Sequence, residues 1–188
     1  MMRSSGCNLD FATLIFMKPL HIATLHGCSI VRWVGTEMAL SEGIAEDGPV
    51  LWDHPSVPYL QLISIDVQLN DGAVYRLLSH DDDGTGCDGL YLLVRQAMDT
   101  PSCAESGSIF RTRELSELPI GAAIVSVTDM DGPHAVLRVD IVVGTHTVSC
   151  WAAEVYERDG GDFAIVDRDE SILIQVDGIR PVHKFQLP

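Results

Sequence analysis

The segment HDDDGTGCDG, which begins at His80, holds the densest group of side chains that could take part in chemistry. Carboxylates are ligands that Ca²⁺ prefers, and an EF-hand loop needs oxygen ligands at its first, third and fifth positions, glycine at the sixth and glutamate at the twelfth. When Gly86 is placed at the sixth position, the twelfth is Leu92, which offers no carboxylate. The spacing argues against a calcium site, and we predict no metal site.

The same segment supports an alternative in which the protein is a small enzyme or a metal-dependent domain. His80 is followed by Asp81, Asp82 and Asp83, and a histidine beside carboxylates is suited to proton transfer. The sequence contains no G-x-S-x-G elbow, P-loop or dinucleotide-binding glycine fingerprint. We therefore assign no catalytic residue and no cofactor, and the enzyme remains the second hypothesis.

The charge of the chain is more informative than any single motif. It has 27 acidic and 12 basic residues, for a formal net charge of −15. A field of this sign repels the phosphates of nucleic acids and anionic membranes and attracts cationic proteins. The composition thus predicts a basic protein as partner, with no nucleic acid and no membrane. A third hypothesis is a β-rich accessory or scaffold protein whose acidity only keeps it in solution.

The carboxylates concentrate in the segment after His80 and in residues 154–177. Because hairpin tips gather near one edge of a sheet, we expect both groups to contribute to an acidic surface. The predicted partner-binding carboxylates are Asp81, Asp82, Asp83, Asp88, Glu154, Glu157, Asp159, Asp162, Asp167, Asp169 and Glu170. Aromatic side chains often anchor interfaces, and Tyr91, Trp151 and Tyr156 are the candidates here.

The cysteines bear on the compartment. There are 5, they are widely spaced, and none forms a C-x-x-C pair. An odd, scattered set is typical of reduced thiols, which indicates a cytoplasmic protein. Cys150 lies in an apolar strand pattern and is expected to be a core residue.

Alternating apolar residues separated by Gly, Asp and Asn predict a mainly β fold, α+β at most. We expect antiparallel meander sheets that form a sandwich or half-barrel-like core, with one or two short helices. In residues 60–69, the set containing Ile63, Ile65 and Val67 is expected to face the core alone. Residues 70–72, Asn-Asp-Gly, predict a hairpin turn.

Three less regular segments receive specific predictions. Residues 35–46 are expected to contain a short helix capped by Thr36, and residues 111–118 a helical turn. The sequence Asp-Glu-Ser at 169–171 is expected to turn the chain between two separate strands. A change of phase near Trp151 predicts a β-bulge.

The domain organisation follows from these patterns. Residues 1–18 are expected to be a flexible or strand-like extension, and residues 19–188 one β-rich domain. The loop-rich segment 96–119 leaves open two lobes, 19–95 and 120–188, joined by that segment.

The function that fits these properties best is neutralisation of a basic protein. The most concrete form is an immunity protein of the bacterial kind, which inhibits a cationic, nuclease-like toxin. A nuclease must attract phosphate, so its inhibitor is expected to present carboxylates in place of the nucleic acid.

Overall fold

The computed structural model describes residues 22–41, 50–81, 88–99, 101, 108–131 and 135–182, so the expected extension at 1–18 lies outside the described residues. A 3₁₀ helix, η1 (Ile22–Leu25), comes first. The strands that follow are β1 (Ser29–Met38), β2 (Leu60–Leu69), β3 (Val74–His80), β4 (Gly89–Arg95), β5 (Phe110–Glu114), β6 (Gly121–Asp131), β7 (Ala135–Val143), β8 (His146–Glu157) and β9 (Phe163–Val176). The fold is therefore mainly β, as the sequence predicts.

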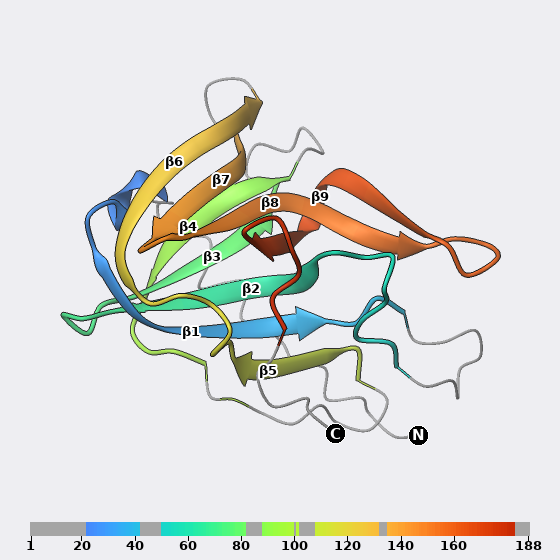
Figure 1. Ribbon diagram of the computed structural model, residues 1–188, viewed down its shortest axis with the longest axis horizontal. Coiled ribbons are helices and arrows are strands. Elements are labelled where there is room, and N and C mark those ends of the chain that lie inside the picture. Colours follow the sequence, from blue (N-terminus) through green and yellow to red (C-terminus); the bar gives the residue numbers. More distant parts are fainter. Residues whose placement is uncertain are drawn as a thin grey trace.

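The sheet closes on itself. Its strand order is β4-β3-β2-β9-β8-β7-β6-β1-β5, and an additional pairing joins β1 to β2. That pairing closes a barrel of 6 strands, to which β3, β4 and β5 are added (Figure 1). All the pairings between these strands are antiparallel.

β1 and β2 each divide one edge between two neighbours. Residues 60–62 of β2 pair with β9, whereas residues 64–68 of β2 pair with β3. In β1, residues 29–30 pair with β6 and residues 34–38 pair with β5. The β3–β4 hairpin lies opposite β7 and β8, and apolar side chains fill the space between them.

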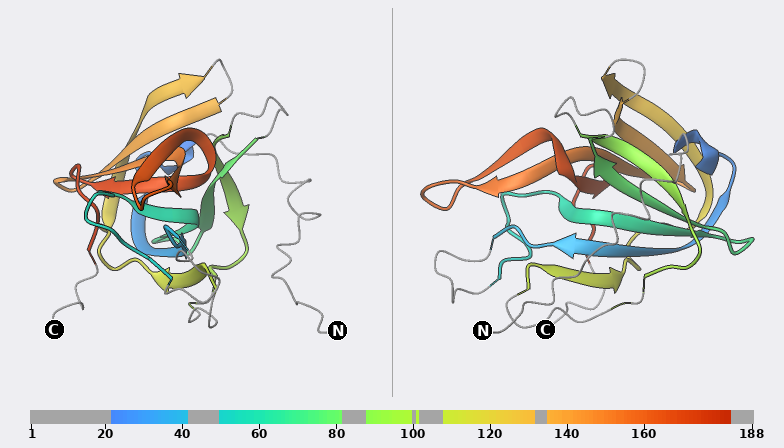
Figure 2. Two further views of the ribbon diagram at one scale, coloured as in Figure 1. Left: turned by 90° about the vertical axis from the view of Figure 1, so that its right-hand side faces the viewer. Right: turned by 180° about the vertical axis from the view of Figure 1, so that it is seen from behind.

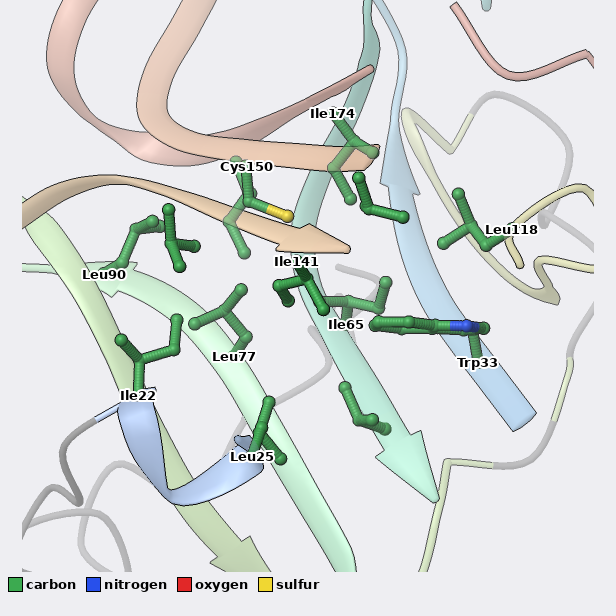
Figure 3. Close-up of a cluster of buried hydrophobic side chains, with 14 of the residues drawn as sticks. Ile22, Leu25, Trp33, Ile65, Leu77, Leu90, Leu118, Ile141, Cys150 and Ile174 are labelled. Atoms are coloured by element: carbon green, nitrogen blue, oxygen red, sulfur yellow. The ribbon is translucent and has the colours of Figure 1, made fainter. Parts of the chain in front are cut away.

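One apolar cluster occupies this space, and its members come from the whole described chain, from Ile22 in η1 to Ile174 in β9. Figure 3 shows Leu77 and Leu90, from β3 and β4, facing Ile141 and Cys150 from β7 and β8. Burial raises the pKa of Cys150 to about 12, so its thiol stays protonated. Strands that precede residues 96–119 in the sequence and strands that follow them line the same core. β5 lies within residues 96–119.

The prediction that β2 buries one face alone is wrong. Leu60 and Leu62 are as fully buried as Ile65 and Val67. The pairing with β1 shifts register between Ser64 and Leu62, so a bulge moves residues on both sides of it onto the same core face. The hairpin turn at residues 70–72 is confirmed: the Gly72 amide donates to the Leu69 carbonyl oxygen at 3.0 Å.

Two segments predicted to be helical begin as strands. Residues 35–38 belong to β1, while residues 42–49 lie outside the described residues. At Gly35 a Cβ would come within 2.8 Å of Leu115 Cδ1, so glycine serves close packing here rather than a helix start. Residues 111–114 belong to β5, because they pair with β1. The turn is confined to residues 115–118, where the Leu118 amide donates to the Leu115 carbonyl oxygen at 3.1 Å.

The expected separate strands at 163–168 and 172–176 form one strand, β9, interrupted by a bulge. Ala152 of β8 faces Ile172, and the next residue, Ala153, faces Asp167. Residues 168–171 therefore have no counterpart on β8, and the predicted turn is a β-bulge between two halves of one ladder. The predicted phase change near Trp151 is confirmed at this point.

The β8–β9 hairpin extends beyond the barrel. Figures 1 and 2 show its orange outer half projecting past the ends of β1 and β2. We call residues 153–167 the arm. Within the described ranges, no helix is long and apolar enough to cross a membrane.

Candidate binding surface

The bulge at residues 168–171 lies against the ends of the β3–β4 hairpin. Ser79, near the end of β3, donates its hydroxyl hydrogen bond to the Asp169 carbonyl oxygen at 2.6 Å. The amide of Asp88, just before β4, donates to the Arg168 carbonyl oxygen at 3.3 Å. Arg168 has a φ of 64°, a left-handed conformation that turns the bulge out of the ladder. These contacts join the two acidic segments of the sequence.

The carboxylates that meet here share a face of the arm. Glu154 and Tyr156 alternate along β8 and point to the same side, together with Val166 of β9, which pairs with Glu154. We call this surface the bulge face. It is formed by Asp88, Glu154, Tyr156, Val166, Asp169 and Glu170.

Hydrogen bonds hold two members of the bulge face in place. The Ser171 hydroxyl donates to Glu154 Oε2 at 2.9 Å, and Glu154 is buried. The Tyr156 hydroxyl donates to Asp169 Oδ2 at 3.1 Å, while the tyrosine remains 43% exposed. The surface thus combines carboxylates with an exposed aromatic ring.

Burial and repulsion between carboxylates both act on the titratable groups of the bulge face. Burial raises the pKa of Asp88, and the charges of Glu170, Asp169 and Asp81 raise it further. Burial also raises the pKa of Glu154, with further increases from Asp169 and Glu170. Burial, Glu154 and Asp169 raise the pKa of Tyr156 to about 12, so its hydroxyl stays a donor. A cation placed here would relieve this repulsion.

Substituting Asp88 by Asn is expected to increase the free energy of unfolding at neutral pH by up to about 0.5 kcal/mol. The pKa of Asp88 is higher in the folded protein than in the unfolded chain, so its ionisation costs stability as pH rises through the folded value. The gain should vanish below the pKa of the unfolded aspartate, about 3.9, where both forms are neutral. Urea titrations of D88N and parent across pH measure this; a loss of stability at every pH would contradict it.

The remaining predicted carboxylates are distributed differently. Glu157, Asp159, Asp162 and Asp167 are exposed on the arm and its tip, Asp81 is half-buried after β3, and Asp82 and Asp83 lie outside the described residues. Asp177 is held by its own partners: His146 Nδ1 lies 2.6 Å from Asp177 Oδ2, and the Thr147 amide donates to Asp177 Oδ1. These contacts lower its pKa.

The aromatic candidates also separate. The ring of Trp151 packs edge-on against Tyr59 at 4.8 Å, and the guanidinium of Arg138 lies 5.2 Å from its centre. Tyr91 is half-buried on β4. Tyr156 lies beside the clustered carboxylates, where its hydroxyl donates to Asp169.

His80, on which the enzyme hypothesis depends, is exposed at the end of β3. Its charge acts on Asp88, whose pKa it lowers. Among the residues that the structure describes, no group of three or more His, Cys, Asp or Glu side chains is arranged to hold a metal ion.

Two buried ionic networks were not predicted. In the first, Arg76 contacts Asp66 through Nε at 2.7 Å and also Asp99 at 2.5 Å. In the second, Glu37 on β1 meets Arg111 at 2.8 Å and Arg113 at 2.9 Å, both from β5. Opposite charges on paired strands mark both networks, because Asp66 faces Arg76 and Glu37 faces Arg111 in register. This pattern can be recognised in the sequence only when the strand pairing is known.

The exposed apolar residues of the arm were also missed. Ile165 is 43% and Val166 44% exposed on β9.

Comparison with known proteins assigns no relative: no protein-family model, no curated protein and no solved structure matches this chain.

Proposed function

We propose that this protein binds and neutralises a basic protein through the bulge face and the arm, in the manner of an immunity protein that inhibits a cationic, nuclease-like toxin. The observation that carries the proposal is the crowding of carboxylates on the bulge face, where burial raises the pKa values of Asp88 and Glu154 and the charges of Asp169 and Glu170 raise them further. A lysine or arginine from a partner supplies the positive charge that these groups lack.

The composition of the surface supports a protein as partner. Tyr156 and Val166 expose apolar area beside the carboxylates, and interface hot spots commonly combine an aromatic anchor with charged neighbours. The exposed carboxylates of the arm extend the negative field outward, which accelerates encounter with a cationic surface by about 10 to 1,000-fold.

Capture from a native lysate on the immobilised chain, with and without the bulge-face charges, tests this function. The parent chain is expected to retain one basic protein at about 50 mM salt, and Asp169→Asn combined with Glu170→Gln should slow its association about tenfold. The matched control, Asp71→Asn with Glu114→Gln, removes the same charge from the β2–β3 turn and from β5. Neither control residue belongs to the bulge face, so association should be almost unchanged.

Two results would reject the proposal. One is association of the basic protein at the same rate with both double variants, which would mean that the position of the carboxylates on the surface does not matter. The other concerns neutralisation: a captured protein that is toxic when expressed alone should become harmless when the parent chain is co-expressed. Toxicity that persists with the parent chain would exclude an immunity role.

A further inference from the structure

The arm leaves one edge of β9 without a neighbouring strand. Residues 163–167 of β9 pair with β8 on one side. On the other side, the pairing of β9 with β2 is confined to residues 172–174. Within the described part of the chain, no strand pairs with the outer edge of residues 163–167.

The direction of the backbone groups on this edge follows from the hydrogen bonds of β8. The Val155 amide donates to Gln61 Oε1 at 2.7 Å and so points away from β9. In an antiparallel ladder the residue opposite such an amide also directs its N–H and C=O outward. That residue is Ile165, and by alternation Phe163 and Asp167 share its orientation. The hydrogen bond from the Arg158 amide to the Asp162 carbonyl oxygen, at 2.7 Å, fits the same alternation.

We propose that this edge of β9 accepts an extended segment of the basic partner as an added β-strand. The inference rests on the proposed function and specifies how the partner is recognised. Main-chain hydrogen bonds to Ile165 and its alternating neighbours would supply binding, and side chains on alternate faces would supply specificity.

Charge complementarity selects this occupant over a second copy of the same chain. Residues 154–170 contain the acidic residues Glu154, Glu157, Asp159, Asp162, Asp167, Asp169 and Glu170, and the basic residues Arg158 and Arg168. Two arms paired edge to edge would bring these carboxylates together, which is unfavourable. The flanking bulge and charges therefore protect the edge from self-association while they attract a cationic strand.

The two faces of the arm define the sequence that fits. On an added strand, every second side chain lies on the bulge face, beside Val166 and one strand away from Glu154 and Tyr156, and should be arginine or lysine, whose long side chains can extend to those groups. The intervening side chains lie on the face of Ile165, which is 43% exposed, and should be apolar. The recognised segment therefore alternates basic and apolar residues.

The test uses the full chain and a blocked octapeptide in which arginine and valine alternate. Two further peptides are N-methylated on the backbone, one at every arginine amide and the other at every valine amide. Each keeps its charge and side chains, but it loses the N–H donors along one edge of the strand. The unmodified peptide should bind and slow hydrogen exchange at the Ile165 amide, and one methylated peptide should bind about tenfold more weakly or worse. On the protein side, Ile165→Pro should weaken binding similarly, whereas Ile165→Val should retain it.

The outcomes separate this inference from the function on which it rests. If both methylated peptides bind as well as the parent peptide, and exchange at Ile165 does not change, strand addition is wrong while the acidic surface keeps its role. If the parent peptide fails to bind at about 50 mM salt, where electrostatic attraction is only moderately screened, both proposals are overturned.

Discussion

Replacing Arg76 by methionine is expected to lower the free energy of unfolding by about 3–5 kcal/mol. The substitution leaves Asp66, whose side chain is 1% exposed, as a buried carboxylate without its cation. Arg76 donates to both oxygens of Asp66, at 2.7 and 2.9 Å, and to Asp99. The amide of Asp99 also donates to Asp66, so the same network ties the segment after β4 to β2. Urea-induced unfolding of R76M and parent measures the loss.

A matched control comes from the surface. Arg32→Met breaks the ion pair with Glu114, whose side chains are 39% and 51% exposed, and should cost less than about 1 kcal/mol. The double variant Asp66→Leu with Arg76→Met should recover part of the loss, because an apolar pair carries no unpaired charge. Equal costs for R76M and R32M would show that the buried network contributes nothing beyond an ordinary surface pair.

The second large effect is expected for Glu37→Gln, again about 3–5 kcal/mol. Glu37 is the shared carboxylate of Arg111, Arg113 and, at 3.8 Å, Arg180. Burial lowers the pKa of Arg180, and the charges of Arg113 and Arg111 lower it further. Without Glu37 the three guanidiniums would repel one another, and the amide hydrogens of glutamine would face donors.

Glu114→Gln provides the control for this prediction, because it makes the same substitution on β5 at an exposed pair. We expect E114Q to change the free energy of unfolding by less than about 1 kcal/mol. Thermal and urea unfolding should rank the two variants in the same order. An E37Q protein as stable as E114Q would mean that the arginines find other partners, and the proposed role of Glu37 would be wrong.

The contrast between these networks and the bulge face distinguishes structural charge from candidate binding charge. Asp66 and Glu37 each meet guanidinium groups within the fold. At the bulge face, burial raises the pKa values of Asp88 and Glu154, and the neighbouring carboxylates Asp169 and Glu170 raise them further. The first arrangement stabilises the folded chain; the second costs stability and is relieved by an external cation.

Much of the local structure could be predicted from the sequence. In β7, Val139, Ile141 and Val143 occupy every second position, the spacing of one strand face, and the structure places all three in the core. The turn at residues 70–72 was predictable because Asn, Asp and Gly tolerate the required backbone conformations, and Gly72 has a φ of 88°. These features depend on neighbours along the chain, so periodicity and turn chemistry are sufficient to determine them.

The closure of the barrel and the assembly of the bulge face were decided by tertiary structure. Closure depends on the pairing of β1 with β2, and the bulge face depends on contacts such as that of Ser79 with Asp169. The carboxylates of both acidic segments were visible in the sequence, but their proximity was not. Periodicity defines which side of a strand is apolar; it does not define which edges pair or in which register. Only the packing of strands distant in sequence makes those choices, because each choice depends on how the whole core is filled.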